Sequence, residues 1–213
     1  LNSDYLTTGN KVIEFENKIK SFTKAKFASV CNSGTSALYL SMLGIGLKNN
    51  DNVIMPAINF IASYNACMIL NAKVYLADVD PITGQMTAET LKECIKINKI
   101  KKIKLIISMY LGGSALNVKE FYKIKKKYNC FLIEDACHAL GSEYKNGNKK
   151  VRVGSCNHSD VCTFSFHPIK SITTAEGGAI TTNNKNIIDR ITLLRSHGII
   201  RNNRQKHWEY DVK

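Results

Sequence analysis

One lysine in this sequence has neighbours of the types that let an amine act as a nucleophile. Lys170 follows an apolar run, residues 161–166, and precedes a stretch rich in hydroxyl side chains that ends in Gly177 and Gly178. A nucleophilic lysine must lose its proton near neutral pH, which requires a partly desolvated site. Hydroxyls nearby can anchor the phosphate of a cofactor that carries an aldehyde. We therefore predict that Lys170 forms a Schiff base with such a cofactor.

A carboxylate stands upstream at the end of a second apolar run. Residues 131–134 read as a buried strand, and Asp135 follows them directly. Burying a carboxylate there costs free energy unless a cation or hydrogen-bond donors meet it. In an enzyme that uses pyridoxal 5'-phosphate (PLP), the ring nitrogen would be that cation, and the protonated ring would act as an electron sink. A helix N-cap or a structural ion pair is the alternative interpretation of Asp135.

A third candidate segment is a turn between a predicted strand and a predicted helix. Ser33, Gly34, Thr35 and Ser36 occupy this turn. Free backbone N–H groups and the positive end of the helix dipole would face an anion such as phosphate there. An ordinary helix N-cap explains the same residue types, because Ser and Thr are favoured at that position.

The elements that must position these residues alternate along the chain, which predicts βαβ units and a mostly parallel sheet. Predicted strands cover residues 27–31, 53–55, 74–77, 104–108, 130–134, 161–166 and 179–182. Predicted helices cover residues 11–22, 36–47, 60–70, 88–95, 118–128 and 185–195. Ligands bind beyond the carboxyl ends of the strands in such sheets, and every candidate residue lies at such an end.

Three phrases, residues 133–141, 164–178 and 194–199, resemble the DegT/DnrJ/StrS family of PLP-dependent sugar aminotransferases. The resemblance runs along the whole chain and implies an α/β fold. The expected fold is the large domain of the PLP-dependent transferases of fold type I, the aspartate aminotransferase type. A mostly parallel sheet in this domain carries helices on both faces.

The resemblance also assigns roles to residues. Lys170 would carry the cofactor and move the proton at the substrate carbon, Asp135 would meet the ring nitrogen, and His138 would reach the phenolic oxygen. Phe60 would stack on the ring, although a core phenylalanine is the usual alternative, and the remaining residues would bind the phosphate. The expected cofactor-binding set is Thr35, Ser36, Phe60, Asp135, His138, Ser165 and Lys170.

The activity that the resemblance implies is transfer of the amino group of L-glutamate to C4 of a nucleotide-linked 4-keto-6-deoxy sugar. The three phrases favour the branch that uses a UDP-linked N-acetyl sugar for surface glycans of the pseudaminic acid type. Lys170 argues against the related dehydratases, which have histidine there. Residues 110–114 depart from the branch's pattern near the substrate side. Another nucleotide-sugar aminotransferase, or a PLP-binding fragment without turnover, remains the alternative.

We expect residues 1–213 to form one PLP-binding large domain, with an incomplete N-terminal segment before residues 4–9 and a small C-terminal domain missing. The resemblance implies a homodimer for the full-length protein.

The net charge of +13 raises nucleic acid as a partner, but no nucleic-acid motif accompanies the lysines, so we expect them to cover solvated faces. The seven cysteines include no Cys-x-x-Cys pair, which favours reduced thiols in the cytoplasm. Cys156, His158, Asp160 and Cys162 alternate along a predicted strand and would not converge on a metal. We expect neither a metal site nor a membrane span.

Overall fold

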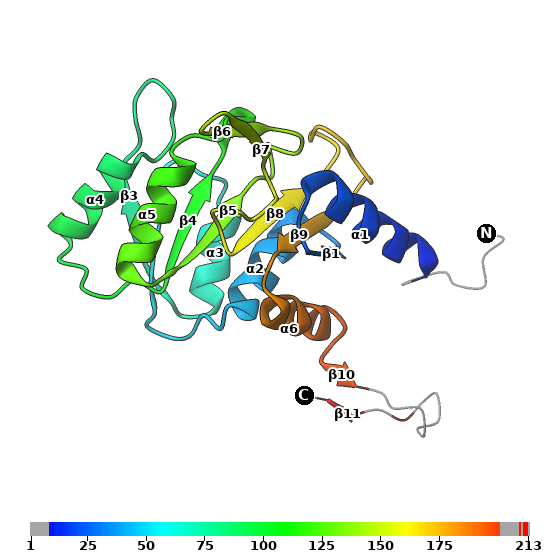
Figure 1. Ribbon diagram of the computed structural model, residues 1–213. Coiled ribbons are helices and arrows are strands. Elements are labelled where there is room, and N and C mark those ends of the chain that lie inside the picture. The colour runs from blue at the N-terminus through cyan, green and yellow to red at the C-terminus, as the bar shows by residue number, and fades with distance from the viewer. Residues whose placement is uncertain (1–8, 201–208, 210, 213) are drawn as a thin grey trace.

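The helices and strands of this chain build one central sheet with helices on both faces (Figure 1). The structure is a computed structural model and describes residues 9–200, 209, 211 and 212. Residues 4–8 of the expected N-terminal segment lie outside the described part. The strands of the central sheet are β1 (Phe27–Cys31), β2 (Asn52–Pro56), β3 (Lys73–Ala77), β4 (Leu105–Met109), β5 (Phe131–Asp135), β8 (Val161–Ser165) and β9 (Gly178–Thr182).

Six α-helices of the described part connect or flank these strands. They are α1 (Asn10–Thr23), α2 (Gly34–Gly44), α3 (Ala62–Ile69), α4 (Ala88–Ile97), α5 (Val118–Tyr128) and α6 (Lys185–Arg195). The smaller elements are a 3-10 turn η1 (Leu111–Gly113) and the strands β6 (Glu143–Asn146), β7 (Lys149–Arg152), β10 (Ile199–Ile200) and β11 (Asp211–Val212). The predicted order of helices and strands in the central sheet is therefore confirmed, with boundaries shifted by a few residues.

The central sheet has the strand order β1-β9-β8-β5-β4-β2-β3. The pairs from β8 to β3 are parallel, and β9 is antiparallel to both of its neighbours. Parallel neighbours require a long crossover, usually a helix, whereas residues 166–177 between β8 and β9 contain none. The prediction of a mostly parallel sheet is confirmed, and β9 is the exception because its connection is too irregular to cross the sheet.

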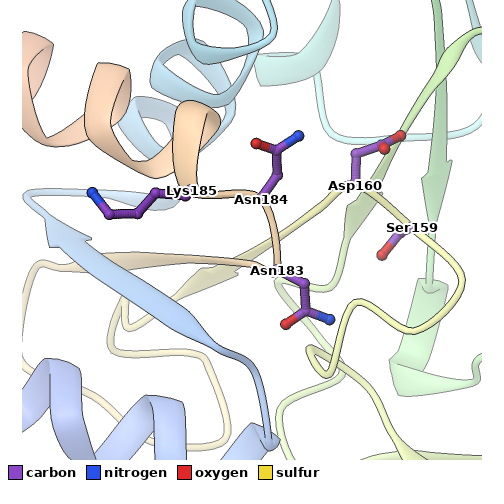
Figure 2. A pocket seen from close by; sticks show the side chains of 5 residues that line it. All are labelled: Ser159, Asp160, Asn183, Asn184 and Lys185. Carbon is purple, nitrogen blue, oxygen red and sulfur yellow. The ribbon is translucent and has the colours of Figure 1, made fainter.

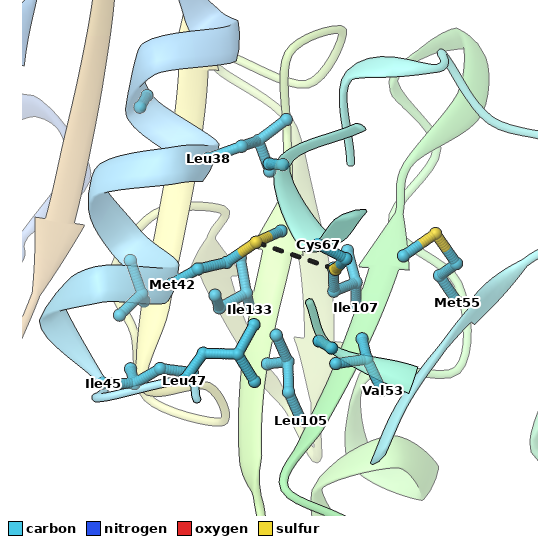
Figure 3. Close-up of a cluster of buried hydrophobic side chains, with 14 of the residues drawn as sticks. Leu38, Met42, Ile45, Leu47, Val53, Met55, Cys67, Leu105, Ile107 and Ile133 are labelled. Atoms are coloured by element: carbon cyan, nitrogen blue, oxygen red, sulfur yellow. Dashed lines mark hydrogen bonds between the residues drawn. The ribbon is translucent and has the colours of Figure 1, made fainter. Parts of the chain in front are cut away.

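Two of the three buried apolar clusters of the described residues lie on opposite faces of the sheet. One packs α2, α3 and α6 against strand residues such as Ile107 and Ile133, and Figure 3 shows its centre, where the Cys67 thiol lies 3.7 Å from the Met42 sulfur. The other packs α4 and α5 against Ile106 and Leu132. All of β4 is buried, as expected for a parallel strand covered on both sides. Each fully buried Leu, Ile or Met stabilises the fold by about 1.5–3 kcal/mol.

Side chains at the helix starts explain where several helices begin. Ser33 caps α2 by accepting a hydrogen bond from the Ser36 N–H, and Thr87 and Thr90 form a capping box at α4. Asn184 caps α6 in the same way. Since Ser33 is the cap, α2 begins at Gly34, earlier than the predicted residue 36.

The β6–β7 hairpin was not predicted. Most of its residues are exposed, and many are charged, so the alternation of apolar and polar residues that marks a strand is absent. Asn146 pairs with Lys149, leaving the two-residue loop Gly147-Asn148, and Gly147 has a φ of 60°. That loop sequence is typical of a tight hairpin and was the signal available.

Candidate functional site

The candidate residues lie where the parallel strands of the sheet end. Ser165 ends β8, and Lys170 follows in the next loop, while Asp135 ends β5 with His138 just beyond it. Phe60 follows β2, and Thr35 and Ser36 follow β1 in the first turn of α2. Because carboxyl ends of parallel strands meet at one edge, all seven residues share this edge of the sheet.

Asp135 is a buried carboxylate, 3% exposed, held by donors from two elements. Its Oδ1 accepts a hydrogen bond from the Cys137 backbone N–H at 3.2 Å, and its Oδ2 lies 3.5 Å from the Ser63 hydroxyl of α3. None of the ion pairs found within the described residues includes Asp135. Two donors offset only part of the free energy of burying this charge, so the carboxylate is suited to receive a cationic group.

Lys170 lies half-buried in the loop after β8, where its backbone N–H donates to the His167 carbonyl at 2.9 Å. Burial raises the pKa of the Cys137 thiol, the nearby Asp135 charge adds to the rise, and the Lys170 charge opposes it. Burial lowers the pKa of His138, the Lys170 charge lowers it further, and Asp135 opposes. The interaction between two charges weakens with distance, so groups that shift one another's pKa lie near one another. Lys170, Asp135, Cys137 and His138 therefore form one electrostatic group.

The turn at the start of α2 packs directly against the end of β8. A Cβ built on Gly34 would lie 2.8 Å from the Ser165 Cβ and 3.1 Å from the Cys137 sulfur. The Ser33 hydroxyl lies 3.0 Å from the Ser36 hydroxyl. The N–H groups of the first helical residues have no acceptor within the helix. These N–H groups, the helix dipole and the hydroxyls of this edge make a seat for an anion.

Phe60 precedes α3 by two positions and is 66% exposed. This exposure rules out a place in the hydrophobic core, which was the alternative interpretation of the residue. Ser63, one turn further along the chain, touches Asp135. The Phe60 ring is therefore free to contact a ligand at this edge.

The segment that departs from the branch's pattern borders the same edge. Gly113 approaches His138 so closely that a Cβ on Gly113 would lie 2.7 Å from the His138 carbonyl oxygen. The Ser142 hydroxyl donates to the Gly113 carbonyl, and the buried Gln85 amide donates to the carbonyls of Leu111 and Ser114. The 3-10 turn η1 is thus fixed next to His138.

A hollow of about 410 Å³ lies at the opposite edge of the sheet (Figure 2). It is lined by Ser159, Asp160, Asn183, Asn184 and Lys185. Asp160 precedes β8 and already pairs with Lys125 at 3.1 Å, Asn184 caps α6, and Lys185 pairs with Asp189. Asp160, Asn184 and Lys185 are thus already bound to partners outside this lining, and none of the predicted site residues lies in the hollow.

Cys156, His158, Asp160 and Cys162 do not converge. The Cys156 thiol donates to the Thr181 carbonyl, and His158 lies 2.6 Å from the Tyr144 hydroxyl. Within the described residues, no three His, Cys, Asp or Glu side chains could hold one metal ion. Nor does that part of the chain contain a helix with the length and hydropathy needed to cross a membrane.

Ser63 was missed from the sequence, and Gly34 was named there only as part of the turn. Ser63 reaches Asp135 from a helix 72 residues upstream, and Gly34 lets α2 approach β8. Ser63 carries no local signal, because a serine in the first turn of a helix is common. The Gly34 signal was present, since a glycine between Ser33 and Thr35 at a strand end suggests a close approach of backbones.

Comparison with known proteins agrees with this geometry. The model of the DegT/DnrJ/EryC1/StrS aminotransferase family matches residues 1–212. UDP-4-amino-4,6-dideoxy-N-acetyl-beta-L-altrosamine transaminase of Campylobacter jejuni is 42% identical over 212 residues, covering 100% of this chain and 53% of the relative. GDP-perosamine synthase of Caulobacter vibrioides is 34% identical over 198 residues, covering 93% of this chain and 51% of the relative.

Solved structures give the same result. Helicobacter pylori PseC, an aminotransferase involved in the biosynthesis of pseudoaminic acid, has a TM-score of 0.86 at 32% identity, covering 100% of this chain and 54% of PseC. The PLP form of the putative sugar aminotransferase Spr1654 from Streptococcus pneumoniae has a TM-score of 0.84 at 29% identity, covering 99% of this chain and 55% of Spr1654. The chain spans about half the length of the curated relatives it matches. The expected aminotransferase fold is confirmed, and the chain belongs to the DegT/DnrJ/EryC1/StrS aminotransferase family.

Proposed function

We propose that this chain provides the cofactor site of a PLP-dependent aminotransferase, which moves the amino group of L-glutamate to C4 of a nucleotide-linked 4-keto-6-deoxy sugar. The observation that carries the proposal is the electrostatic group at the carboxyl edge of the sheet. Asp135 is a buried carboxylate without a cationic partner among the described residues, and Lys170 lies close enough to affect its neighbours Cys137 and His138.

The residues of this edge fit PLP. The cofactor has an anionic phosphate, a flat aromatic ring, a ring nitrogen that can be protonated and an aldehyde. The α2 turn is suited to the phosphate, the exposed Phe60 ring to the flat face, Asp135 to the nitrogen and Lys170 to the aldehyde. When bound, PLP supplies a carbon that accepts the amine and a ring that withdraws electrons from the reacting carbon.

Lys170 would hold and move the proton of the reaction at its Nζ atom. It would give up the cofactor when the amino donor arrives, take a proton from the donor's α-carbon and return it on the cofactor side. The Lys170 side chain is half-buried although residues 167–169 and 171–176 around it are exposed, so its contact with water is reduced. Thr173 and Thr174 hold this loop, because the Thr173 hydroxyl and the Thr174 N–H both donate to the Phe166 carbonyl.

The other residues would bind and orient. Thr35, Ser36 and Ser165 would hold the phosphate at the start of α2, and Phe60 would stack on the ring, a contact worth about 1 kcal/mol. His138 would hydrogen-bond the phenolic oxygen. Burial and the Lys170 charge lower the pKa of His138, which favours its neutral form, so this side chain does not compete with the ring nitrogen for Asp135.

The amino acceptor is proposed from the relatives. The curated names include a transaminase of a UDP-linked N-acetylated amino sugar and a GDP-perosamine synthase, which supports a nucleotide-linked ketosugar and favours the UDP-linked N-acetyl type. The turn η1 beside His138 is the segment of this chain that we expect the sugar to meet. We place the activity in surface glycan biosynthesis of the pseudaminic acid kind.

We further propose a homodimer that works in the cytoplasm and binds no nucleic acid. Exposed apolar side chains near the site edge support a subunit interface: Ile58, Phe60, Ile61, Ile169 and Ile172. All seven cysteines are unpaired, which suits a reducing compartment. Light scattering of the purified protein tests the dimer. DNA binding that persists at physiological salt would contradict the proposal that the protein binds no nucleic acid, since nonspecific electrostatic binding weakens steeply with salt.

The function is tested by absorbance spectra of the purified protein. Adding PLP should give a visible band that is absent in Lys170→Ala and kept in Lys104→Ala, which changes a half-buried lysine at the opposite edge of the sheet. L-glutamate should bleach the band, and a UDP-linked 4-keto-6-deoxy sugar should restore it. A Lys170-dependent band that glutamate leaves unchanged would refute an aminotransferase, and failure of the sugar alone would refute the proposed acceptor.

A further inference from the structure

We propose that Ser63 is a positioning residue, which aims the Asp135 carboxylate at the ring nitrogen of PLP. The inference rests on the proposed function. Ser63 is the second residue of α3 and is 1% exposed, so its hydroxyl lies inside the protein. Its Oγ lies 3.5 Å from Oδ2 of Asp135, and the carboxylate can only accept, so the serine is the donor.

The two oxygens of Asp135 are held from different elements. The Cys137 N–H, just after β5, binds Oδ1, and Ser63 of α3 reaches Oδ2. One contact leaves a carboxylate free to rotate about its χ2 torsion, whereas two contacts from separate elements fix its plane. A catalytic group must be held within about 0.5 Å of its productive position, which requires such support.

Helix α3 is a rigid base for this contact. Ala62, Ala66 and Cys67 are buried, and Cys67 packs against Met42 of α2 (Figure 3). No side chain caps the start of α3, so N–H groups of its first turn lack side-chain acceptors. The positive end of the helix dipole therefore lies beside the Asp135 carboxylate.

A second buried helical serine shows the more common arrangement. Ser41 of α2 is also fully buried, and its hydroxyl donates to the Ala37 carbonyl of its own helix at 2.6 Å. Serines inside helices usually make this bond to the preceding turn. Ser63 lies in the first turn, where the bond that the structure gives its hydroxyl leads out of the helix to Asp135. Its position is thus tied to the carboxylate.

The test compares two Ser63 variants, each measured with two cofactors. Ser63→Thr keeps the hydroxyl, and Ser63→Val has the same shape without it, so both variants share any crowding. The dissociation constant is measured for PLP and for an analogue with carbon in place of the ring nitrogen. With PLP, the valine variant should bind about tenfold more weakly than the threonine variant. This loss is at the lower end of the range for a hydrogen bond to a charged group, because the contact between Ser63 and Asp135 is long.

With the analogue, the two variants should bind equally, since Asp135 then has no ring nitrogen to meet. The dissociation constants for both cofactors are also measured for Ser63→Ala and Ser41→Ala. Because alanine is smaller than serine, this pair still tests the inference if the threonine and valine variants do not fold. An equal loss for both cofactors would show a merely structural role, and no loss with PLP would also overturn the inference. If the unaltered protein shows no Lys170-dependent PLP band, the proposed function fails first, and the inference fails with it.

Discussion

Two adjacent carboxyl groups on β5 have opposite surroundings. Glu134 and Asp135 are each 3% exposed and point to opposite faces of the sheet. Glu134 accepts a hydrogen bond from the buried Tyr110 hydroxyl at 2.7 Å, and burial raises its pKa above the usual 4.5. Asp135 faces α3, the Cys137 N–H and the region of Lys170.

The difference separates a structural acid from an acid placed for a ligand. A raised pKa means that Glu134 tends to keep its proton, and its face is closed by apolar side chains such as Phe164 and Val153. Asp135 has two donors, the Cys137 N–H and the Ser63 hydroxyl, and a cation from outside the protein can complete its contacts. In the proposed function, the same strand thus carries a residue for stability on one face and a residue for chemistry on the other.

The largest effect is expected from removing the Asp135 charge, which lies on the ligand side of β5. Asp135→Asn should weaken PLP binding about a hundredfold, since breaking one side of a buried, hydrogen-bonded charge pair costs roughly 2–5 kcal/mol. Absorbance titration with PLP measures it. The matched change on the other face, Glu134→Gln, should leave PLP affinity within about threefold, and a hundredfold loss there would erase the distinction between the two faces.

Tyr110→Phe tests the structural face. Without the hydroxyl, the buried Glu134 carboxyl loses its donor, and the free energy of unfolding should fall by about 2 kcal/mol. Urea unfolding followed by circular dichroism measures it. An unchanged urea midpoint would mean that this hydrogen bond does not stabilise the fold.

Gly34→Ala tests the anion seat that adjoins Asp135. The new Cβ would crowd Ser165 and Cys137, so PLP should bind about tenfold more weakly, whereas pyridoxal, which lacks the phosphate, should be little affected. Gly44→Ala is the control, because a Cβ there would be equally crowded, 2.7 Å from Ile191, at the far end of the same helix. Equal losses for PLP and pyridoxal would argue against phosphate binding at this turn.

The smallest expected effect concerns pH. The folded-state pKa of Glu134 is raised above 4.5, so the folded protein holds this proton to higher pH than the unfolded chain does. The contribution of Glu134 to the free energy of unfolding is fully present below about pH 4.5 and is lost as pH rises through the folded-state pKa. The total loss is about 1.4 kcal/mol for each unit by which the folded-state pKa exceeds 4.5. Glu134→Gln should flatten the fall in urea midpoint above pH 4.5. A parallel curve for both proteins would show that Glu134 titrates normally.

Much of this fold could be predicted from sequence, because apolar runs such as residues 131–134 and 161–166 match buried strands. The direction of β9 could not, since strand direction depends on the path of an irregular connection. At the candidate site, Lys170 and Asp135 were predicted from their setting at strand ends, and the structure places both at the same edge of the sheet. Ser63 was not, because its role exists only once α3 packs beside β5. The β6–β7 hairpin was missed because its charged strands show no apolar alternation.

The central claim is that Lys170 carries PLP on the Asp135 face of the sheet. Borohydride reduction of the PLP-loaded protein, followed by peptide mass spectrometry, tests it directly, because reduction fixes PLP to the amine that holds it. The account predicts one stoichiometric label on the peptide containing Lys170, lost in Lys170→Ala. A label on another lysine, or none on a protein that binds PLP, would contradict it.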